Sequence, residues 1–182
     1  MRIEEKEVVL RDGRKILLRS PEAADAEGVM EHMRITSGET YFMARYPEEI
    51  VRPVETEAEI LDKICEDEEE FMIAAFWEGR LIGCCSVQRM GAHIKTRHRG
   101  GFGISIQQSF CNAGLGGMMM EEMLDTVKQT HFEQIELGAF EDNEKAIHLY
   151  EKYGFVTWGR QPRAFKLKDG SYRDEIQMIY RK

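Results

Sequence analysis

The stretch that decides the fold passes from an apolar strand through a glycine-bearing turn into a helix, and it reads Ile106-Gln107-Gln108-Ser109-Phe110-Cys111-Asn112-Ala113-Gly114-Leu115-Gly116-Gly117. Such a turn directs several backbone N–H groups and the positive end of the helix dipole at one point. Glycine leaves room for a phosphate to reach those amides. The stretch lacks the third glycine of the dinucleotide fingerprint and the Lys-Ser/Thr pair of a P-loop. It therefore predicts an anion-binding turn, while a glycine helix start that serves only close packing stays open as an alternative.

The segments before this turn indicate antiparallel strands. Residues 71–77 and 80–89 are apolar runs joined by Glu78-Gly79, and they are too short and too tightly connected to be core helices. Residues 98–107 continue as a strand, because Phe102, Ile104 and Ile106 alternate with small residues. The small residues leave one face of this strand open to something that approaches it.

The segments after the turn alternate between helix and strand. Residues 114–130 carry an apolar stripe at helical spacing, formed by Leu115, Met119, Met123 and Val127. A strand over 134–139, a helix over 143–153 and strands over 155–164 and 175–181 follow, with Asp169-Gly170 as the last turn. The methionine run at 118–120 is interpreted as adaptable core packing.

The first seventy residues open with a hairpin. Residues 8–10 and 16–19 pair around Asp12-Gly13, and Ser20-Pro21 indicates the start of a helix that ends near residue 36. An irregular stretch over 37–53 is expected to form a binding loop, and a second helix runs over 55–70. The acidic run that ends this helix, 66–70, is interpreted as solvated rather than as a metal or polyamine site. Strands mixed with helices predict an α/β or α+β fold with a twisted mixed sheet, and we expect residues 1–182 to form a single domain.

Composition narrows the range of functions. With 25 Lys+Arg against 33 Asp+Glu, the net charge of -8 argues against a general nucleic-acid binder. The apolar runs are far shorter than the roughly 20 residues that span a bilayer, so no membrane segment is expected. A charged N-terminus and four cysteines without a CxxC pair favour a reducing, cytoplasmic location, and no metal site is expected.

A second motif lies in the later helix. Residues 143–155 read Asn143-Glu144-Lys145-Ala146-Ile147-His148-Leu149-Tyr150-Glu151-Lys152-Tyr153-Gly154-Phe155. This segment is similar to the N-x-x-A-x-x-L-Y-x-x-x-G-F segment of the GCN5-related N-acetyltransferases. The glycine turn resembles that family's acetyl-CoA motif, and residues 172–178 resemble its closing strand. The resemblance implies a sheet flanked by about four helices. Two middle strands of this sheet separate and admit the pantetheine arm of acetyl-CoA.

The resemblance also implies which residues bind acetyl-CoA. They are Ile104, Ile106, Cys111, Asn112, Ala113, Gly114, Leu115, Gly116, Gly117, Asn143 and Ala146. Cys111 departs from the family pattern, which has Gln or Arg at this position. A cysteine beside a helix N-terminus would have a lowered pKa, so we expect Cys111 to be reactive.

The resemblance implies direct attack of a small amine or a peptide amine on the thioester. A backbone N–H of residues 104–106 would stabilise the oxyanion, and Tyr150 would donate to the departing thiolate. No base is assigned, since Glu39 and Glu136 are interpreted as ordinary surface carboxylates. An acyl-CoA-binding module without turnover is the alternative function, and a homodimer is expected because isologous pairs are the commonest oligomers.

Overall fold

The computed structural model describes all residues, 1–182, and is built on one eight-stranded sheet in the order β1-β2-β3-β4-β5-β6-β8-β7. The strands are β1 (Lys6–Val9), β2 (Lys15–Arg19), β3 (Phe71–Trp77), β4 (Arg80–Arg89), β5 (Arg99–Ile106), β6 (Gln134–Phe140), β7 (Val156–Lys166) and β8 (Tyr172–Arg181). The helices are α1 (Ala26–Glu39), α2 (Val54–Glu66), α3 (Leu115–Val127) and α4 (Glu144–Lys152), with short 3₁₀ turns η1 (Ala23–Asp25), η2 (Pro47–Glu49) and η3 (Gln108–Phe110). The α/β prediction is confirmed, and none of these helices is long and apolar enough to cross a membrane.

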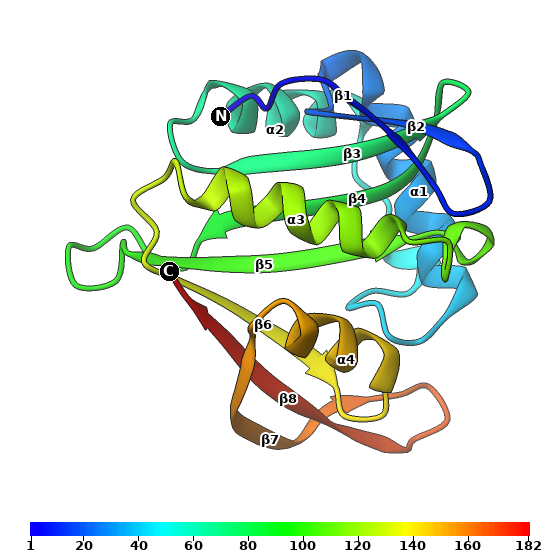
Figure 1. Cartoon of the computed structure of the whole chain (residues 1–182). Helices are drawn as coiled ribbons and strands as arrows, with labels where there is room; N and C mark the ends of the chain where they lie inside the picture. The colour runs from blue at the N-terminus through cyan, green and yellow to red at the C-terminus, as the bar shows by residue number, and fades with distance from the viewer.

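Every neighbouring strand pair is antiparallel except β5 and β6, which are parallel and pair only from Arg99–Gly101 to Gln134–Glu136. Beyond these three pairs the two strands separate, and we call this opening the fork (Figure 1). Close packing sets the pairing: a Cβ on Gly100 would lie 2.9 Å from side-chain atoms of both Ile135 and Val87. Glycine at this position therefore lets the three strands approach before β5 and β6 diverge.

Two helices cover each face of the sheet, and the core on one face is the larger. α3 and α4 lie on one face (Figure 1), where Met119, Met120 and Met123 are fully buried in the larger core cluster. α1 and α2 bury Val29 and Leu61 in a smaller cluster against β3 and β4 on the opposite face. The packing role proposed for the methionine run thus matches the buried positions of Met119 and Met120.

The first helix begins later than the sequence suggested. Ser20 does not cap it, because the Ser20 hydroxyl instead accepts a hydrogen bond from the amide of Ile3 (3.0 Å). Glu22 and Asp25 form a capping box on η1, and α1 then starts at Ala26. Asp25 also pairs with Arg19 at 2.7 Å, so the end of β2 and the start of α1 are joined by an ion pair that local capping signals do not reveal.

The acidic run after α2 is only partly solvated. α2 stops at Glu66, and Glu66 and Glu68 are exposed, whereas the other three carboxylates gather around Arg89. The Arg89 guanidinium lies 2.8 Å from Asp67, 3.1 Å from Glu69 and 3.4 Å from Glu70. This contact holds the pKa of Asp67 well below its usual range. Three residues of the run therefore anchor the end of β4, an ion-pair cluster that the sequence alone did not reveal.

Candidate active site

The fork exposes two backbone amides of β5. Gln107 N–H donates to Ile82 O of β4 at 3.0 Å, and Met90 N–H donates to Arg99 O at 3.0 Å. Because peptide groups alternate in direction along a strand, the amides of Gly103 and Ser105 also point toward β4. The amides of Ile104 and Ile106 therefore point the other way, into the opening that β6 has left.

The turn after β5 ends in a helix start with free donors. Asn112 (φ 61°) and Gly114 (φ 99°) both have positive φ, and Gly114 is the N-cap of α3. The first bond of the helix runs from Met118 N to Gly114 O at 3.2 Å, so the amides of residues 115–117 make no hydrogen bond within the protein. Free amides at the positive end of a helix dipole suit an anion, so the geometry is compatible with the expected anion-binding turn.

The same glycines also allow α4 to approach α3. A Cβ on Gly116 would lie 3.2 Å from Leu149, and one on Gly117 would lie 2.8 Å from the Tyr153 hydroxyl. Close packing was the alternative interpretation of the glycine turn, and the glycines do serve it. This packing places α4, the helix of the second motif, beside the free amides of α3.

Arg11 is a candidate residue that sequence reasoning missed. Its amide donates to Ala113 O at 3.0 Å, and its Nε lies 3.7 Å from where a Cβ on Gly114 would stand. No carboxylate pairs with its guanidinium. The hairpin between β1 and β2 therefore brings a positive charge to the anion-binding turn, and only the pairing of distant segments creates this arrangement.

Cys111 lies in the turn, and its side chain is not activated. Its Sγ lies 3.8 Å from Ile106 O and 3.6 Å from Gln107 O, both of which accept from the thiol. Desolvation and then the nearby Glu39 carboxylate raise its pKa, so the expected lowering was wrong. The residue is exposed overall while its sulfur is partly desolvated, and Cys111 precedes the helix start by four residues, too far for the dipole to dominate.

Tyr150 lies under the fork on the α3 and α4 face. Its ring packs edge-to-face on Phe102 (6.3 Å, 87°) and against Phe155 (6.0 Å). Burial raises its pKa to about 12, so the phenol is protonated at neutral pH. Its hydroxyl makes no hydrogen bond within the protein, and it is not among the fully enclosed unpartnered atoms. A ligand in the fork could accept that proton's hydrogen bond.

The remaining predicted residues divide between backbone and side-chain roles. Asn143 uses its Oδ1 to cap α4, accepting from Ala146 N at 3.3 Å, which leaves its amide nitrogen free. Leu115 and Ala113 are buried in the core, so only their backbone can face a ligand. No group of three or more His, Cys, Asp or Glu side chains is arranged to hold a metal ion.

The two carboxylates considered as a base differ in their surroundings. Glu136 is only 7% exposed and pairs with Arg99 at 2.5 Å, which lowers its pKa. Glu39 accepts from the amide of Gln108 at 2.9 Å and so fixes the start of η3. The surface interpretation was therefore wrong for Glu136, whereas Glu39 is a partly exposed carboxylate that holds the turn beside the fork.

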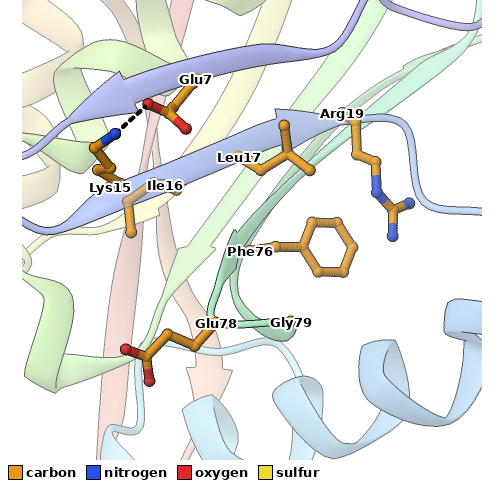
Figure 2. Close-up of a pocket in the computed structure, with 8 residues that line it drawn as sticks. All are labelled: Glu7, Lys15, Ile16, Leu17, Arg19, Phe76, Glu78 and Gly79. Atoms are coloured by element: carbon orange, nitrogen blue, oxygen red, sulfur yellow. Dashed lines mark ion pairs between the residues drawn. The ribbon is translucent and has the colours of Figure 1, made fainter.

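Two hollows mark the surface. A cavity of about 590 Å³ lies on the α1 and α2 face, beside the fork, and its floor is formed by the small residues Ser86, Gly101, Gly103 and Gly138. A separate pocket of about 220 Å³ lies near the β1 edge. Figure 2 shows the Lys15–Glu7 ion pair (3.1 Å) at one end of it and Phe76 near Arg19 at the other. None of the predicted site residues lines this second pocket.

Comparisons with known proteins show the family of this chain. Residues 22–155 match the model described as the acetyltransferase (GNAT) family. The chain is 34% identical over 107 residues to an L-amino acid N-acetyltransferase of Escherichia coli (58% of this chain, 65% of that protein). It is 29% identical over 85 residues to N-alpha-acetyltransferase 30 of Saccharomyces cerevisiae (46% and 48%). The matched region thus spans less than two thirds of either relative.

Solved structures match over most of the chain. A GNAT-family acetyltransferase from Streptococcus pneumoniae superposes with a TM-score of 0.88 at 26% identity, covering 92% of this chain and 99% of that one. An acetyltransferase structure from Salmonella typhimurium with its cofactor acetyl-CoA gives 0.79 at 14% identity, covering 91% and 93%. These structures share the fold of this chain.

Proposed function

Since the chain belongs to the GNAT family of acetyltransferases, we propose that it transfers the acetyl group of acetyl-CoA to a primary amine by direct attack. The observation that carries this proposal is the fork, where the amides of Ile104 and Ile106 point into the opening between β5 and β6. Donors fixed at this point suit a thioester carbonyl whose oxygen gains charge during the reaction.

Acetyl-CoA binding is assigned to the residues that surround the fork and the turn. The free amides of Leu115, Gly116 and Gly117 hold the pyrophosphate, and Arg11 supplies the positive charge that Cys111 does not. The neighbouring backbone of Asn112, Ala113 and Gly114 shapes the turn. Asn143 and Ala146, at the start of α4, line the path toward the fork.

The chain's groups then divide the chemical work. The acceptor's ammonium group gives one proton to water before attack, and its nitrogen then bonds to the thioester carbon. A second proton passes from this nitrogen to water as the amide forms. The amides of Ile104 and Ile106 stabilise the oxyanion that forms. As the carbon–sulfur bond breaks, the electron pair stays on the sulfur, and the Tyr150 hydroxyl donates a hydrogen bond to the leaving thiolate, which then takes a proton from water. A pKa of about 12 keeps the phenol protonated for this role.

The test is release of CoA from acetyl-CoA, followed with a thiol reagent, against a panel of amines. We expect binding of acetyl-CoA in the micromolar range, about −8 kcal/mol by calorimetry, together with turnover of at least one amine. Binding without turnover of any amine would favour the alternative, an acyl-CoA-binding module. Absence of both would overturn the proposal.

We also propose that residues 1–182 act as one domain, and that the protein works as a homodimer in the cytoplasm. The continuous sheet supports a single domain. The four cysteines are free, which suits a reducing compartment. The dimer proposal rests on β7, an eleven-residue edge strand that leaves Val156 and Trp158 more than half exposed.

A further inference from the structure

The cavity beside the fork has polar walls whose side chains are not used by the protein. Ser86, Gln88, Glu175 and Gln177 line it, and none of their side chains forms a hydrogen bond or an ion pair. Trp158, 58% exposed, stands at its edge. Such a set of free donors and acceptors over a glycine floor is suited to a small polar ligand.

The one charged side chain of this cavity without an ion-pair partner is a carboxylate, that of Glu175. Its two arginines are already neutralised, Arg89 by the acidic run after α2 and Arg99 by Glu136. Glu175 has no positive partner, and its carboxylate lies over Gly138, where a Cβ would collide with it. A positively charged ligand group would pair with Glu175, whereas a carboxylate on the ligand would find no free cation in the cavity.

Strand register places Glu175 across the fork from the proposed reaction centre. Gly101 pairs with Glu136, so four residues further along each strand Ser105 lies level with Phe140, and Phe140 pairs with Glu175. These side chains share one face of the sheet. Two strand spacings separate β5 from β8, about 10 Å, and the fork widens that distance. Glu175 is thus too far away to touch an acceptor nitrogen that attacks a thioester held at the Ile104 amide. It is placed to contact the opposite end of that acceptor.

We propose that this cavity binds the acceptor amine and that Glu175 pairs with a second positive charge at the acceptor's far end. The inference rests on the proposed function and names its substrate class, an amine that carries a second cationic group. Ser105, whose Oγ lies 2.8 Å from His32 Nε2, forms the opposite wall of the fork.

The test compares three acceptors of equal chain length: 1,4-diaminobutane, 1-aminobutane and 4-aminobutanoate, with 1,3-diaminopropane and 1,5-diaminopentane to vary the span. We expect kcat/KM for the best diamine to exceed that for 1-aminobutane by about tenfold or more, with 4-aminobutanoate the poorest. Glu175→Gln should remove most of this preference while changing kcat/KM for 1-aminobutane less than about twofold. The matched control is Glu59→Gln, an exposed carboxylate of α2 without an ion pair.

Each outcome decides the inference separately from the proposed function. If wild-type protein fails to bind acetyl-CoA in calorimetry, the proposed function fails. If it binds acetyl-CoA and the diamine preference is absent, or persists in Glu175→Gln, the inference is overturned. If no amine is acetylated, titration of 1,4-diaminobutane into the CoA complex decides: binding that weakens about tenfold in Glu175→Gln supports the inference, and no binding overturns it.

Discussion

At the scale of single residues, burial decides what Tyr150 and His32 can do. Both side chains lose water, and the cost of charge in that environment raises the pKa of Tyr150 to about 12 and lowers the pKa of His32 to about 4. Each residue is therefore uncharged at neutral pH. The phenol remains a donor, and the imidazole remains neutral beside Ser105.

Tyr150→Phe tests the donor. The change keeps the ring packed on Phe102 and removes only the hydroxyl, so we expect kcat to fall by roughly 10²-fold while acetyl-CoA affinity stays nearly unchanged. Steady-state kinetics and calorimetry on the same preparation measure both. Unaltered turnover, in an assay limited by the chemical step, would remove Tyr150 from the mechanism.

Arg11→Gln tests the charge beside the anion-binding turn. Loss of an ionic contact with pyrophosphate should weaken acetyl-CoA binding about tenfold and reduce its salt dependence. Pantetheine, which lacks the pyrophosphate, should bind wild type and variant equally. Lys15→Gln is the matched control, because Lys15 lies in the same hairpin and pairs with Glu7. Equal loss in both variants would contradict the assignment.

His32 should make stability depend on pH. In the folded chain the pKa of His32 is about 4, below its usual value of 6.5. Between pH 4 and 6.5, His32 is therefore protonated in the unfolded chain and neutral in the folded chain. Stability should therefore fall by about 3 kcal/mol as pH drops from 6.5 toward 4. Urea unfolding across this range measures the loss, and His32→Gln should remove the part due to His32. The part due to carboxylates with lowered pKa, such as Glu136, should remain near the acid end. Replacement of the exposed His148 should leave the pH dependence unchanged.

At the scale of elements, the start of α3 combines two demands in a few residues. Gly114 adopts φ 99°, where a Cβ is strained, and Gly116 and Gly117 let Leu149 and Tyr153 of α4 approach. The turn thus presents its amides and seats the neighbouring helix at once. A side chain at Gly114 would strain the turn, whereas one at Gly116 or Gly117 would push against α4.

Gly114→Ala separates strain from ligand binding. Both it and the control Gly170→Ala place alanine at a positive φ, so each should lose about 1–2 kcal/mol of unfolding free energy. Only Gly114→Ala should also weaken acetyl-CoA binding, because Gly170 lies in the β7–β8 turn. Chemical denaturation and calorimetry measure the two effects. Equal affinities in the two variants would show that the turn does not hold the ligand.

At the scale of the whole molecule, the two ends of the sheet differ. β1 has four residues and β7 has eleven, so β7 offers much the longer row of unpaired backbone groups. An edge of that length with exposed apolar side chains requires protection in solution. Pairing with a second copy would provide it.

Light scattering tests the pairing. We expect twice the mass of the 21.1 kDa chain, and Val156→Lys on β7 should shift the protein toward a monomer. Val9→Lys on the opposite edge strand, where Val9 is 53% exposed, serves as the control. A single-chain mass for the wild type at working concentration would reject the dimer.

The sequence by itself determined the order of helices and strands, the family and the two motifs. Side-chain periodicity, turn glycines and the spacing from Asn143 to Phe155 are local properties that a linear reading registers. The ranges of β3, β4, β5 and α3 accordingly agree with expectation to within a few residues.

Tertiary structure alone decided which distant residues meet. It placed Arg11 beside Gly114, put Arg89 among the carboxylates after α2, and set Glu175 across the fork from Ser105. It also gave Cys111 a raised pKa where the helix start suggested a lowered one. Each of these depends on strand order and on desolvation, which arise from contacts between segments far apart in the chain and leave no trace in local patterns.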